Sequence, residues 1–147
     1  MSTQPISLES FPLRSFEKLR YGDTDRQGHV NNAVFSTFLE TGRVEFLHAQ
    51  GARVMDEDCS FVIARLELEF LKEVLWPGTV EIGTGVERVG TSSISLSQAV
   101  FQNGVCVAKA KTTVVHVNNQ TRRSQPLSEE AVGRLKALTT EAHAGET

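Results

Sequence analysis

The sequence is poor in the residues and runs that mark several large classes of protein. It has two cysteines among 147 residues, Cys59 and Cys106, and neither has a partner at CxxC spacing. This excludes a zinc ribbon and leaves one disulfide possible but unnecessary. No apolar run reaches the about 18 residues that suggest a membrane span, and residues 1–14 contain no apolar signal region. We therefore expect a cytoplasmic protein without a membrane span.

Basic runs are also missing. The 15 Lys and Arg residues against 18 Asp and Glu give a net charge of −3, and no basic cluster is long enough to follow a phosphate backbone. We therefore expect neither nucleic acid nor a membrane surface as a partner. Hydrophobic residues at 39% and charged residues at 22% are ordinary for a globular chain. The length predicts a single domain, 1–147, with loose ends at about 1–12 and 142–147.

A helical pattern runs from about residue 31 to residue 50. Its apolar stripe consists of Val34, Phe35, Phe38, Leu39, Gly42, Phe46 and Leu47. Asn31 or Asn32 suits the N-cap, and Gly51 suits the position after the helix C-terminus. Gly42 in the interior predicts that another segment closely approaches the helix backbone. A stripe this wide predicts that a sheet covers the helix.

Alternating patterns predict strands before and after that helix. The predicted strands are residues 14–21, 65–70, 80–87, 93–102 and 105–117. Asn103-Gly104 between the last two is typical of a two-residue hairpin. Ser128 predicts the N-cap of a short C-terminal helix. Together these elements predict an α+β fold in which an antiparallel sheet wraps around one long central helix.

Several common catalytic and metal-binding motifs are absent. The sequence has no GxGxxG motif, no GxxxxGK[ST] phosphate loop and no complete nucleophile elbow. Its histidines share no ligand spacing, so we expect no bound metal. The informative stretch is instead residues 21–32, Tyr-Gly-Asp-Thr-Asp-Arg-Gln-Gly-His-Val-Asn-Asn, which leads straight into the predicted helix.

This stretch places two carboxylates, Asp23 and Asp25, beside a histidine and two asparagines just before a helix N-terminus. Free backbone N–H groups and the positive end of the helix dipole can hold a developing oxyanion there. A carboxylate opposite those donors can activate water or attack an acyl carbon. The same side chains can also serve only to form turns and cap the helix. The residues by themselves leave both interpretations open.

The segment Asp23–Asn32, followed by Phe35, Phe38-Leu-Glu40 and Arg43-Val-Glu45-Phe, resembles the hotdog-fold thioesterases of the 4-hydroxybenzoyl-CoA thioesterase type. Its His-Val-Asn-Asn portion is also similar to plant acyl-ACP thioesterases. The resemblance extends through the strands to about residue 120. It implies a hotdog fold and hydrolysis of an acyl-CoA thioester without a metal or redox cofactor, coenzyme A being part of the substrate.

The resemblance also implies roles for individual residues. Asp25 matches the second aspartate of the family's DxD, which acts as general base toward water or as nucleophile. The backbone N–H of Asn32, seven positions later, matches the oxyanion donor. His29 and Asn31 match residues that orient the thioester or water in the acyl-ACP enzymes, or else they brace the loop. We expect Asp23 to have a structural role in the turn.

Other side chains are secondary candidates. Arg88 and Arg122 could meet the phosphates of coenzyme A, or each could be a solvated charge. Glu40 stands where another branch of hotdog thioesterases has its catalytic acid, and we expect it instead to pair with Arg43 or to lie at a subunit contact. Three phenylalanines suggest either an apolar acyl slot or simply the core: Phe35, Phe38 and Phe61.

Two alternative functions stay open on the sequence, a hotdog enoyl-CoA hydratase or dehydratase using His29 and a non-catalytic acyl-CoA-binding module. The acyl chain, and whether CoA or an acyl-carrier protein presents it, are not determined by these residues. An open sheet edge predicts a homodimer or homotetramer, and we expect the strands at 93–117 to supply that edge. The resemblance implies a shared site, in which the loop 55–61 of one subunit borders Asp25 of the other.

Overall fold

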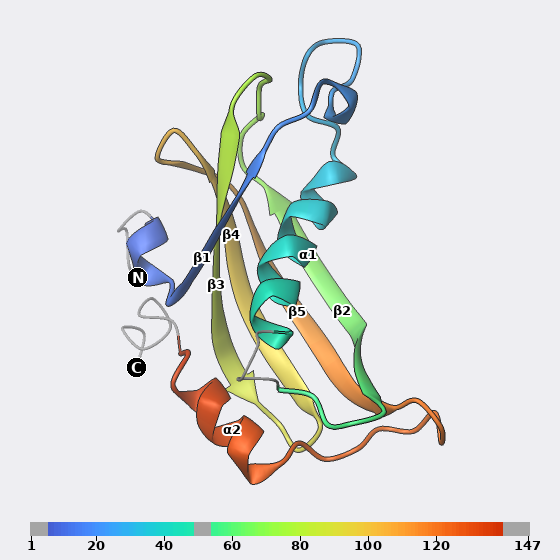
Figure 1. The fold of residues 1–147 in the computed structure, drawn as a ribbon. Coiled ribbons are helices and arrows are strands. Elements are labelled where there is room, and N and C mark those ends of the chain that lie inside the picture. The colour runs from blue at the N-terminus through green and yellow to red at the C-terminus, as the bar shows by residue number, and fades with distance from the viewer. Residues whose placement is uncertain (1–5, 49–53, 140–147) are drawn as a thin grey trace.

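One long helix lies against one face of a curved sheet of five antiparallel strands (Figure 1). The computed structural model describes residues 6–48 and 54–139. The elements are η1 (Leu8–Ser10), β1 (Leu13–Lys18), η2 (Tyr21–Asp23), α1 (Val34–Leu47), β2 (Cys59–Phe70), β3 (Thr79–Val89), β4 (Ser93–Gln102), β5 (Val105–Asn118) and α2 (Glu129–Lys136). The strand order is β1-β3-β4-β5-β2. The α+β arrangement predicted from the sequence is confirmed.

The apolar stripe of α1 forms the core with the concave face of the sheet. Phe35, Phe38 and Leu39 are almost fully buried and pack with the β3 and β4 residues Ile82 and Val100. The expected close approach at Gly42 is confirmed: a Cβ there would lie 2.6 Å from Thr84 Oγ1 and 2.9 Å from Gln98 Nε2. Only glycine lets the sheet come this near to the helix backbone.

The helix begins slightly later than its sequence pattern predicts. A turn at residues 32–33 precedes the first residue of α1, Val34. The side chain of Asn31 accepts the backbone N–H of Ala33 at 2.9 Å, and its carbonyl accepts that of Val34 at 2.9 Å. The N-cap of α1 is Ala33, so the prediction of Asn31 or Asn32 at that position is wrong, and Asn31 instead closes the turn that precedes the helix. The predicted terminal Gly51 lies outside the described residues.

Strand β2 is longer than the alternation at 65–70 predicts, because it begins at Cys59. Its pairing with β5 shifts register between Ile63 and Arg65. Phe61 and Ile63 occupy inner-face positions before this bulge, and Leu66 and Phe70 occupy them after it, opposite buried residues of β5. One extra residue breaks the period of two, so the sequence pattern reveals only the second half of the strand.

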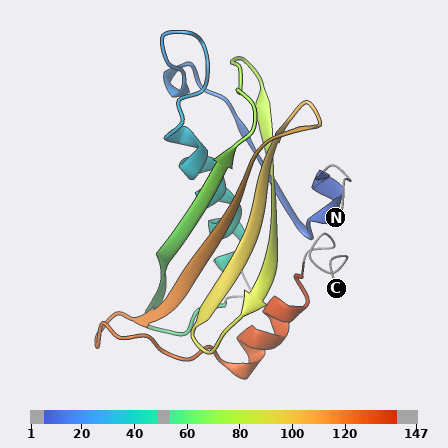
Figure 2. The ribbon, with the colours of Figure 1, turned by 180° about the vertical axis from the view of Figure 1, so that it is seen from behind.

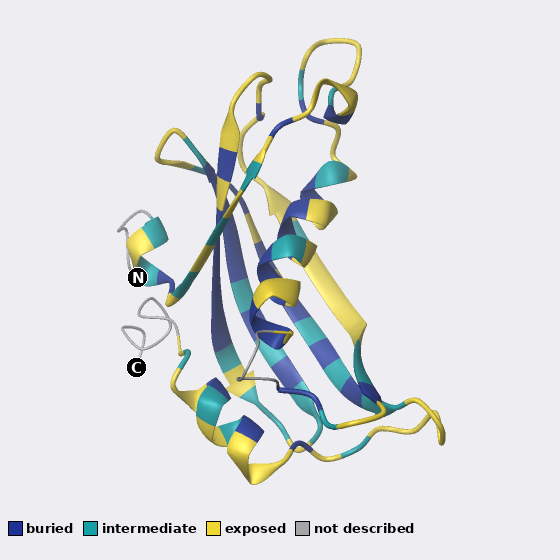
Figure 3. Cartoon of the chain, viewed as in Figure 1, coloured by how far each residue is buried: buried dark blue, intermediate teal, exposed yellow. Residues whose placement is uncertain are grey.

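The prediction that the strands at 93–117 form the edge of the sheet is wrong. Strands β4 and β5, at 93–102 and 105–118, each pair with a neighbour on both sides, and the edges are β1 and β2. Because β2 follows α1 in the chain but pairs with β5, it closes the far side of the sheet (Figure 2). Figure 3 shows β2 as a mostly exposed strand.

Both predicted hairpin and cap signals of the later chain are confirmed. Asn103 and Gly104 have φ of 53° and 79°, as a two-residue turn between β4 and β5 requires. The Ser128 hydroxyl accepts the backbone N–H of Ala131 at 3.1 Å and caps α2. At the other end, Phe11 is 3% exposed and packs edge-on against Phe101, so this part of the expected loose segment 1–12 is held on the sheet. None of the helices in the described ranges is long and apolar enough to cross a bilayer.

Candidate active site

Two loops meet at the N-terminal end of α1. The backbone N–H of Val30 donates to Val74 O at 2.8 Å, that of Trp76 donates to Gly28 O at 3.4 Å, and His29 forms a bridge with Leu75. These contacts fasten the loop before α1 to the connection between β2 and β3. Residues 24–31 and 71–76 therefore form one rigid rim above the helix start.

Asp23 anchors the base of this rim. Its side chain is buried and accepts the backbone N–H of Arg20 at 2.9 Å, while Arg20 Nη2 contacts the other carboxylate oxygen at 3.0 Å. Its carbonyl accepts the backbone N–H of Asn31 at 2.8 Å. A buried carboxylate with these partners fixes the loop, and the structural role expected for Asp23 is confirmed.

Asp25 is exposed and held by the loop through only one of its carboxylate oxygens. Oδ1 accepts the backbone N–H of Gln27 at 2.8 Å and that of His29 at 3.2 Å. The backbone N–H of Asp25 donates to His29 O at 2.8 Å. Within the described chain no donor contacts Oδ2. The carboxylate is therefore oriented by the backbone and keeps one oxygen available.

The two asparagines at the helix start differ in their use. The Asn31 side chain is engaged in the turn described above, which favours a bracing role. The backbone N–H of Asn32 has no acceptor in the part of the chain that the structure describes. This N–H lies at the start of the turn that leads into α1, where the helix dipole places partial positive charge. It is a donor available to a ligand.

A pocket of about 300 Å³ brings these groups together. Asp25, His29 and Asn32 line it, as does Lys72. Its apolar wall consists of Val30, Phe35, Phe70, Leu71 and Val74. Of the four catalytic candidates, the structure thus places three around one cavity, while Asn31 holds the helix start beneath it.

Glu73 is a pocket residue that the sequence analysis missed. Its Oε2 lies 3.3 Å from His29 Nε2, and the His29 side chain is 28% exposed. The contact depends on the pairing of the two loops, which are more than 40 positions apart in the chain. No local pattern links these two residues, so only the fold reveals the pair.

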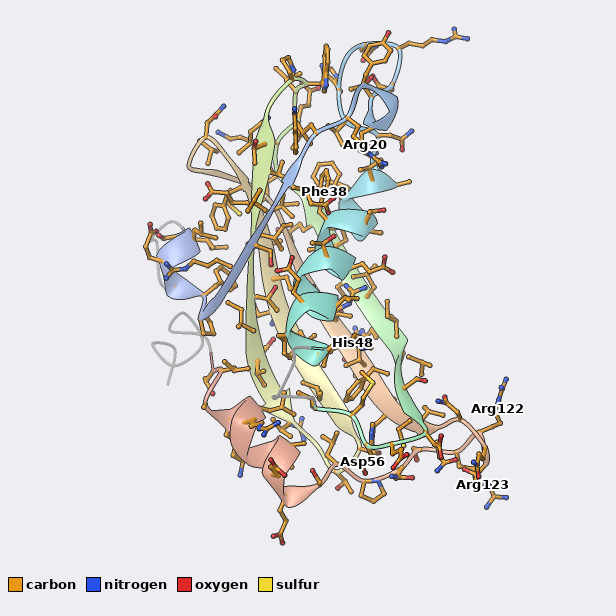
Figure 4. All side chains as sticks on the ribbon, viewed as in Figure 1. Arg20, Phe38, His48, Asp56, Arg122 and Arg123 are labelled. Atoms are coloured by element: carbon orange, nitrogen blue, oxygen red, sulfur yellow. The ribbon has the colours of Figure 1, made fainter. Side chains whose placement is uncertain are left out.

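The arginine candidates lie elsewhere in the single chain. Arg88, on β3, lines a different, charged groove with Arg65 of β2 and Lys111 of β5. Arg122 lies in the connection after β5, at the end of the sheet opposite the labelled Arg20 (Figure 4). Neither lines the pocket that contains Asp25.

Glu40 and Arg43 do not form the direct pair that their spacing predicts. Arg43 is buried, and its Nη1 donates to Gln98 Oε1 at 3.4 Å. Burial lowers the pKa of the Arg43 guanidinium, and the negative charge of Glu40 opposes that effect. Glu40 itself is exposed on α1, and it is not among the residues that line the pocket.

The three phenylalanines named as slot or core have different fates. Phe35 lines the pocket, whereas Phe38 is 1% exposed and packs beneath it in the core. Phe61 lies near the other end of the molecule, where its ring contacts that of His116 with centroids 5.1 Å apart. Phe70, which the sequence analysis did not single out, lines the pocket, and Phe61 does not.

The described residues contain no group of three His, Cys, Asp or Glu side chains that could hold a metal ion. Cys59 and Cys106 are both free thiols. Burial raises the pKa of each thiol above its ordinary value. The charges of Asp56 and Asp58 add to the effect at Cys59, whereas the hydrogen bond to Ala108 and the charge of Lys109 oppose it at Cys106. Neither cysteine lines the pocket.

A family model described as the thioesterase-like superfamily matches residues 19–135. The chain is 26% identical over 134 residues to a protein named acyl-CoA thioester hydrolase YbgC from Escherichia coli O6:H1, covering 88% of this chain and 97% of that one. The chain belongs to the thioesterase-like superfamily. The predicted resemblance is thus confirmed.

Solved structures agree with this assignment. A thioesterase from Thermus thermophilus, solved in complex with coenzyme A and zinc, is 30% identical with a TM-score of 0.75, covering 86% of this chain and 98% of that one. The PA5185 protein from Pseudomonas aeruginosa PAO1 has a TM-score of 0.83 at 24% identity, covering 92% of this chain and 96% of that one. The predicted hotdog fold is confirmed.

Proposed function

We propose that this protein hydrolyses an acyl-CoA thioester to a carboxylic acid and free coenzyme A. The observation that carries the proposal is that one pocket of the described chain is lined both by Asp25, whose carboxylate is oriented by the backbone, and by Asn32, whose backbone N–H has no acceptor there. Family membership and the names of the relatives support the same reaction. The proposed reaction uses no metal and no redox cofactor.

Asp25 supplies the attacking group in one of two ways. As general base, its free Oδ2 takes a proton from water while the water oxygen attacks the thioester carbonyl. As nucleophile, Oδ2 attacks the carbonyl itself, coenzyme A leaves as its thiolate, and water hydrolyses the resulting anhydride. Both routes need one carboxylate oxygen free and the other fixed, which is how the loop holds Asp25.

The backbone N–H of Asn32 stabilises the negative charge that develops on the carbonyl oxygen. A donor at a helix N-terminus needs no reorganisation when that charge forms, which is the most effective kind of oxyanion stabilisation. A thiolate leaves readily, so the reaction asks little of a general acid. His29 then serves to orient the thioester or the water, with Glu73 fixing its ring.

A hydrolysis assay with a thiol reagent tests the proposal directly. Purified protein should release free CoA from acyl-CoA over many turnovers, and it should release no 3-hydroxybutyryl-CoA from crotonyl-CoA. The His29–Glu73 pair is the feature that a hydratase could use, so hydration without hydrolysis would favour that alternative. Stoichiometric binding without turnover would favour the binding module. A matched set of acyl-carrier-protein thioesters compares the two carriers.

We further propose that the protein is at least a homodimer paired along β2. This edge strand of twelve residues exposes its backbone and several apolar side chains: Val62 (47%), Ile63 (51%), Leu66 (38%) and Phe70 (47%). An exposed edge of this kind is a template for pairing. Two-fold antiparallel pairing would set the Cys59 end of one β2 beside the Phe70 end of the other. The loop before Cys59 would then border the partner's pocket, as in the shared site expected from the resemblance.

Light scattering at low micromolar concentration tests this assembly. An active species of 16.2 kDa, the mass of one chain, would contradict it. Replacing Ile63 and Leu66 with lysine places charge on the exposed strand and should yield monomers, while Phe16→Lys on β1, where Phe16 is 68% exposed, should not. If the monomeric variant also loses its activity, that result would support a site shared between two subunits. The cytoplasmic location stays a prediction.

A further inference from the structure

Four side chains form a row across the face of the sheet that is turned away from α1, the face seen in Figure 2. Followed from β2 through β5 and β4 to β3, the paired positions are Arg65, Thr113, Ser95 and Arg88. Thr113 lies between two buried neighbours on β5, so the row projects outward, away from the core. We call it the arginine row: it has a guanidinium group at each end and two short hydroxyl side chains between them.

Each arginine reaches this outer face because a β-bulge precedes it. The β3–β4 register shifts between Val86 and Arg88, and the β2–β5 register shifts between Ile63 and Arg65. Strict alternation would place both arginines on the inner face, with Val86 and Ile63. Bulges commonly re-aim a side chain in this way. Two bulges in different strands thus bring two guanidinium groups to the same row.

The arginine row borders a groove of about 380 Å³ that also holds two ion pairs. Arg65 pairs with Glu67, and Lys111 Nζ lies 3.2 Å from Glu87 Oε1. In the part of the chain that the structure describes, Arg88 contacts no carboxylate, and neither hydroxyl of the row has a hydrogen-bond partner. The groove therefore has one positive charge in excess and unused hydroxyl donors on its floor.

We propose that this groove binds the phosphate group of a small ligand, with Arg88 as the principal donor. A guanidinium presents parallel N–H groups that match two phosphate oxygens, and the hydroxyls of Ser95 and Thr113 can donate to the remaining oxygen. The groove is larger than a bare phosphate ion needs and falls within the range of small-molecule sites, so it has room for a ligand of nucleotide size. It lies across the sheet from the pocket that contains Asp25, and the proposal does not depend on the proposed reaction.

The proposed dimer leaves this groove open. Pairing along β2 uses the backbone of that edge strand and extends the sheet sideways, whereas the arginine row projects from the outer face of the sheet. Arg88 and Ser95 lie on β3 and β4, which β5 separates from the β2 edge. The phosphate site is therefore built by one chain, whatever the partner subunit adds to the pocket at the start of α1.

Calorimetry on the full chain at low salt tests the site with three probes. AMP and inorganic phosphate should each bind once per chain, and adenosine, which lacks the phosphate, should not bind. The ratio of the AMP and phosphate affinities shows whether the free ion or a nucleotide is the better ligand. Failure of both phosphate probes to bind, or equal affinities for adenosine and AMP, would overturn the proposal.

Substitutions locate the bound phosphate. Arg88→Gln should weaken AMP binding about tenfold, as expected for losing a charged hydrogen bond, and Thr113→Val about threefold. Arg123→Gln removes the same charge from an exposed arginine outside the groove and should leave the affinity unchanged. Equal weakening by Arg88→Gln and Arg123→Gln, or wild-type affinity in both groove variants with wild-type melting, would overturn the proposal.

Two further measurements separate this site from the pocket that contains Asp25 and from a contact between copies. The KM of Arg88→Gln for butyryl-CoA should stay within about twofold of wild type, since a remote residue contributes no substrate binding. A KM that rises as much as the AMP dissociation constant would assign Arg88 to the coenzyme A phosphates and overturn the separate site. Light scattering that shows a smaller assembly for Arg88→Gln, with no phosphate binding by the wild type, would make the groove a contact between copies. If no acyl-CoA is hydrolysed, the proposed function fails, and the AMP measurements still decide this proposal.

Discussion

The two ends of the sheet each carry a histidine and a nearby aspartate, and they use them in opposite ways. At one end His116 is fully buried: its Nδ1 donates to Gln125 O at 2.9 Å, and its Nε2 accepts the backbone N–H of Asp56 at 3.1 Å. At the other end His29 is partly exposed and, within the described chain, the one polar partner of its ring is Glu73. Figure 4 labels Asp56 at the first end and Arg20 at the second.

The comparison shows how polar groups for stability differ from polar groups for chemistry. Around His116 the hydrogen bonds are closed within the protein, since Gln125 Nε2 also donates to Asp56 Oδ2 at 2.9 Å. Such a cluster fastens the loop before β2 and the loop after β5 to strand β5, and it leaves none of these hydrogen-bonding groups for a ligand. Around Asp25, one carboxylate oxygen and the Asn32 N–H are left over. This unused hydrogen-bonding capacity beside a pocket is what the proposed reaction requires, and we call this end of the sheet the reactive end.

The largest expected effect is the loss of turnover when the free Asp25 oxygen is replaced. Asp25→Asn retains Oδ1 for the N–H groups of Gln27 and His29, so the loop should keep its form. It replaces the basic or nucleophilic oxygen by an amide, which should lower kcat by about 10²–10⁴-fold. Steady-state kinetics measure the loss of turnover. Thermal melting measures the stability of the fold, and the melting temperature should be nearly unchanged.

Glu40→Gln is the control for this prediction. Glu40 is the other acid that family resemblance suggests, and it is exposed on α1 and absent from the pocket lining. Its substitution should leave kcat within about twofold, as for a surface change away from the site. If Glu40→Gln abolishes turnover and Asp25→Asn retains more than a tenth of it, Glu40 rather than Asp25 is the catalytic acid and the role proposed for Asp25 is wrong.

A stability loss should follow from opening the closed cluster. His116→Leu fills similar volume but leaves the N–H of Asp56 and the carbonyl of Gln125 without their ring partners. Burying these unsatisfied groups should cost about 2–3 kcal/mol and lower the melting temperature by about 5–10 °C. Urea unfolding measures the loss. The loop that contains Asp56 borders the partner's pocket in the proposed dimer, so the kcat of the folded dimer should fall somewhat, but much less than in Asp25→Asn. A fall in kcat as large as that of Asp25→Asn, at unchanged stability, would contradict the comparison.

Replacing the histidine at the reactive end should have the opposite effect, with a fall in kcat and little change in stability. His29→Asn removes a ring that lines the pocket but is not closed into the fold, so it should lower kcat about tenfold, equivalent to one hydrogen bond of about 1.4 kcal/mol. Melting should change little. His48→Asn, an exposed histidine at the end of α1, is the matched control for activity. A stability loss as large as that of His116→Leu would refute the distinction.

How far the sequence predicts each end depends on how local its signals are. The loop with Asp25 and Asn32 is contiguous, so turn chemistry, helix capping and family resemblance all point to it. The hairpin at Asn103-Gly104 and the Ser128 cap are local in the same sense and are predicted correctly. The His116 cluster joins segments about 60 residues apart, and one histidine in an alternating strand carries no such signal.

The pocket residues that the sequence does not predict were missed for the same physical reason: long-range pairing brings them into the site. Glu73 reaches His29 only because the β2–β3 connection pairs with the loop before α1. Phe70 enters the pocket because a bulge at Ala64 sets which side chains of β2 face inward. A bulge shifts the face of every later residue, and simple alternation cannot anticipate it. Strand order, which makes β2 rather than β5 the edge, is likewise set by long-range pairing.

The smallest expected effect concerns the two thiols and metal ions. Cys59 lies at the His116 end, where burial and the charges of Asp56 and Asp58 raise its pKa, and burial raises the pKa of Cys106. A raised pKa leaves less thiolate at neutral pH, so both thiols should react slowly with iodoacetamide and play no part in catalysis. Activity after alkylation, and after dialysis against EDTA, should match that of untreated protein. Activity lost with EDTA and restored by zinc would instead place a metal at the reactive end and overturn the proposal that Asp25 acts without one.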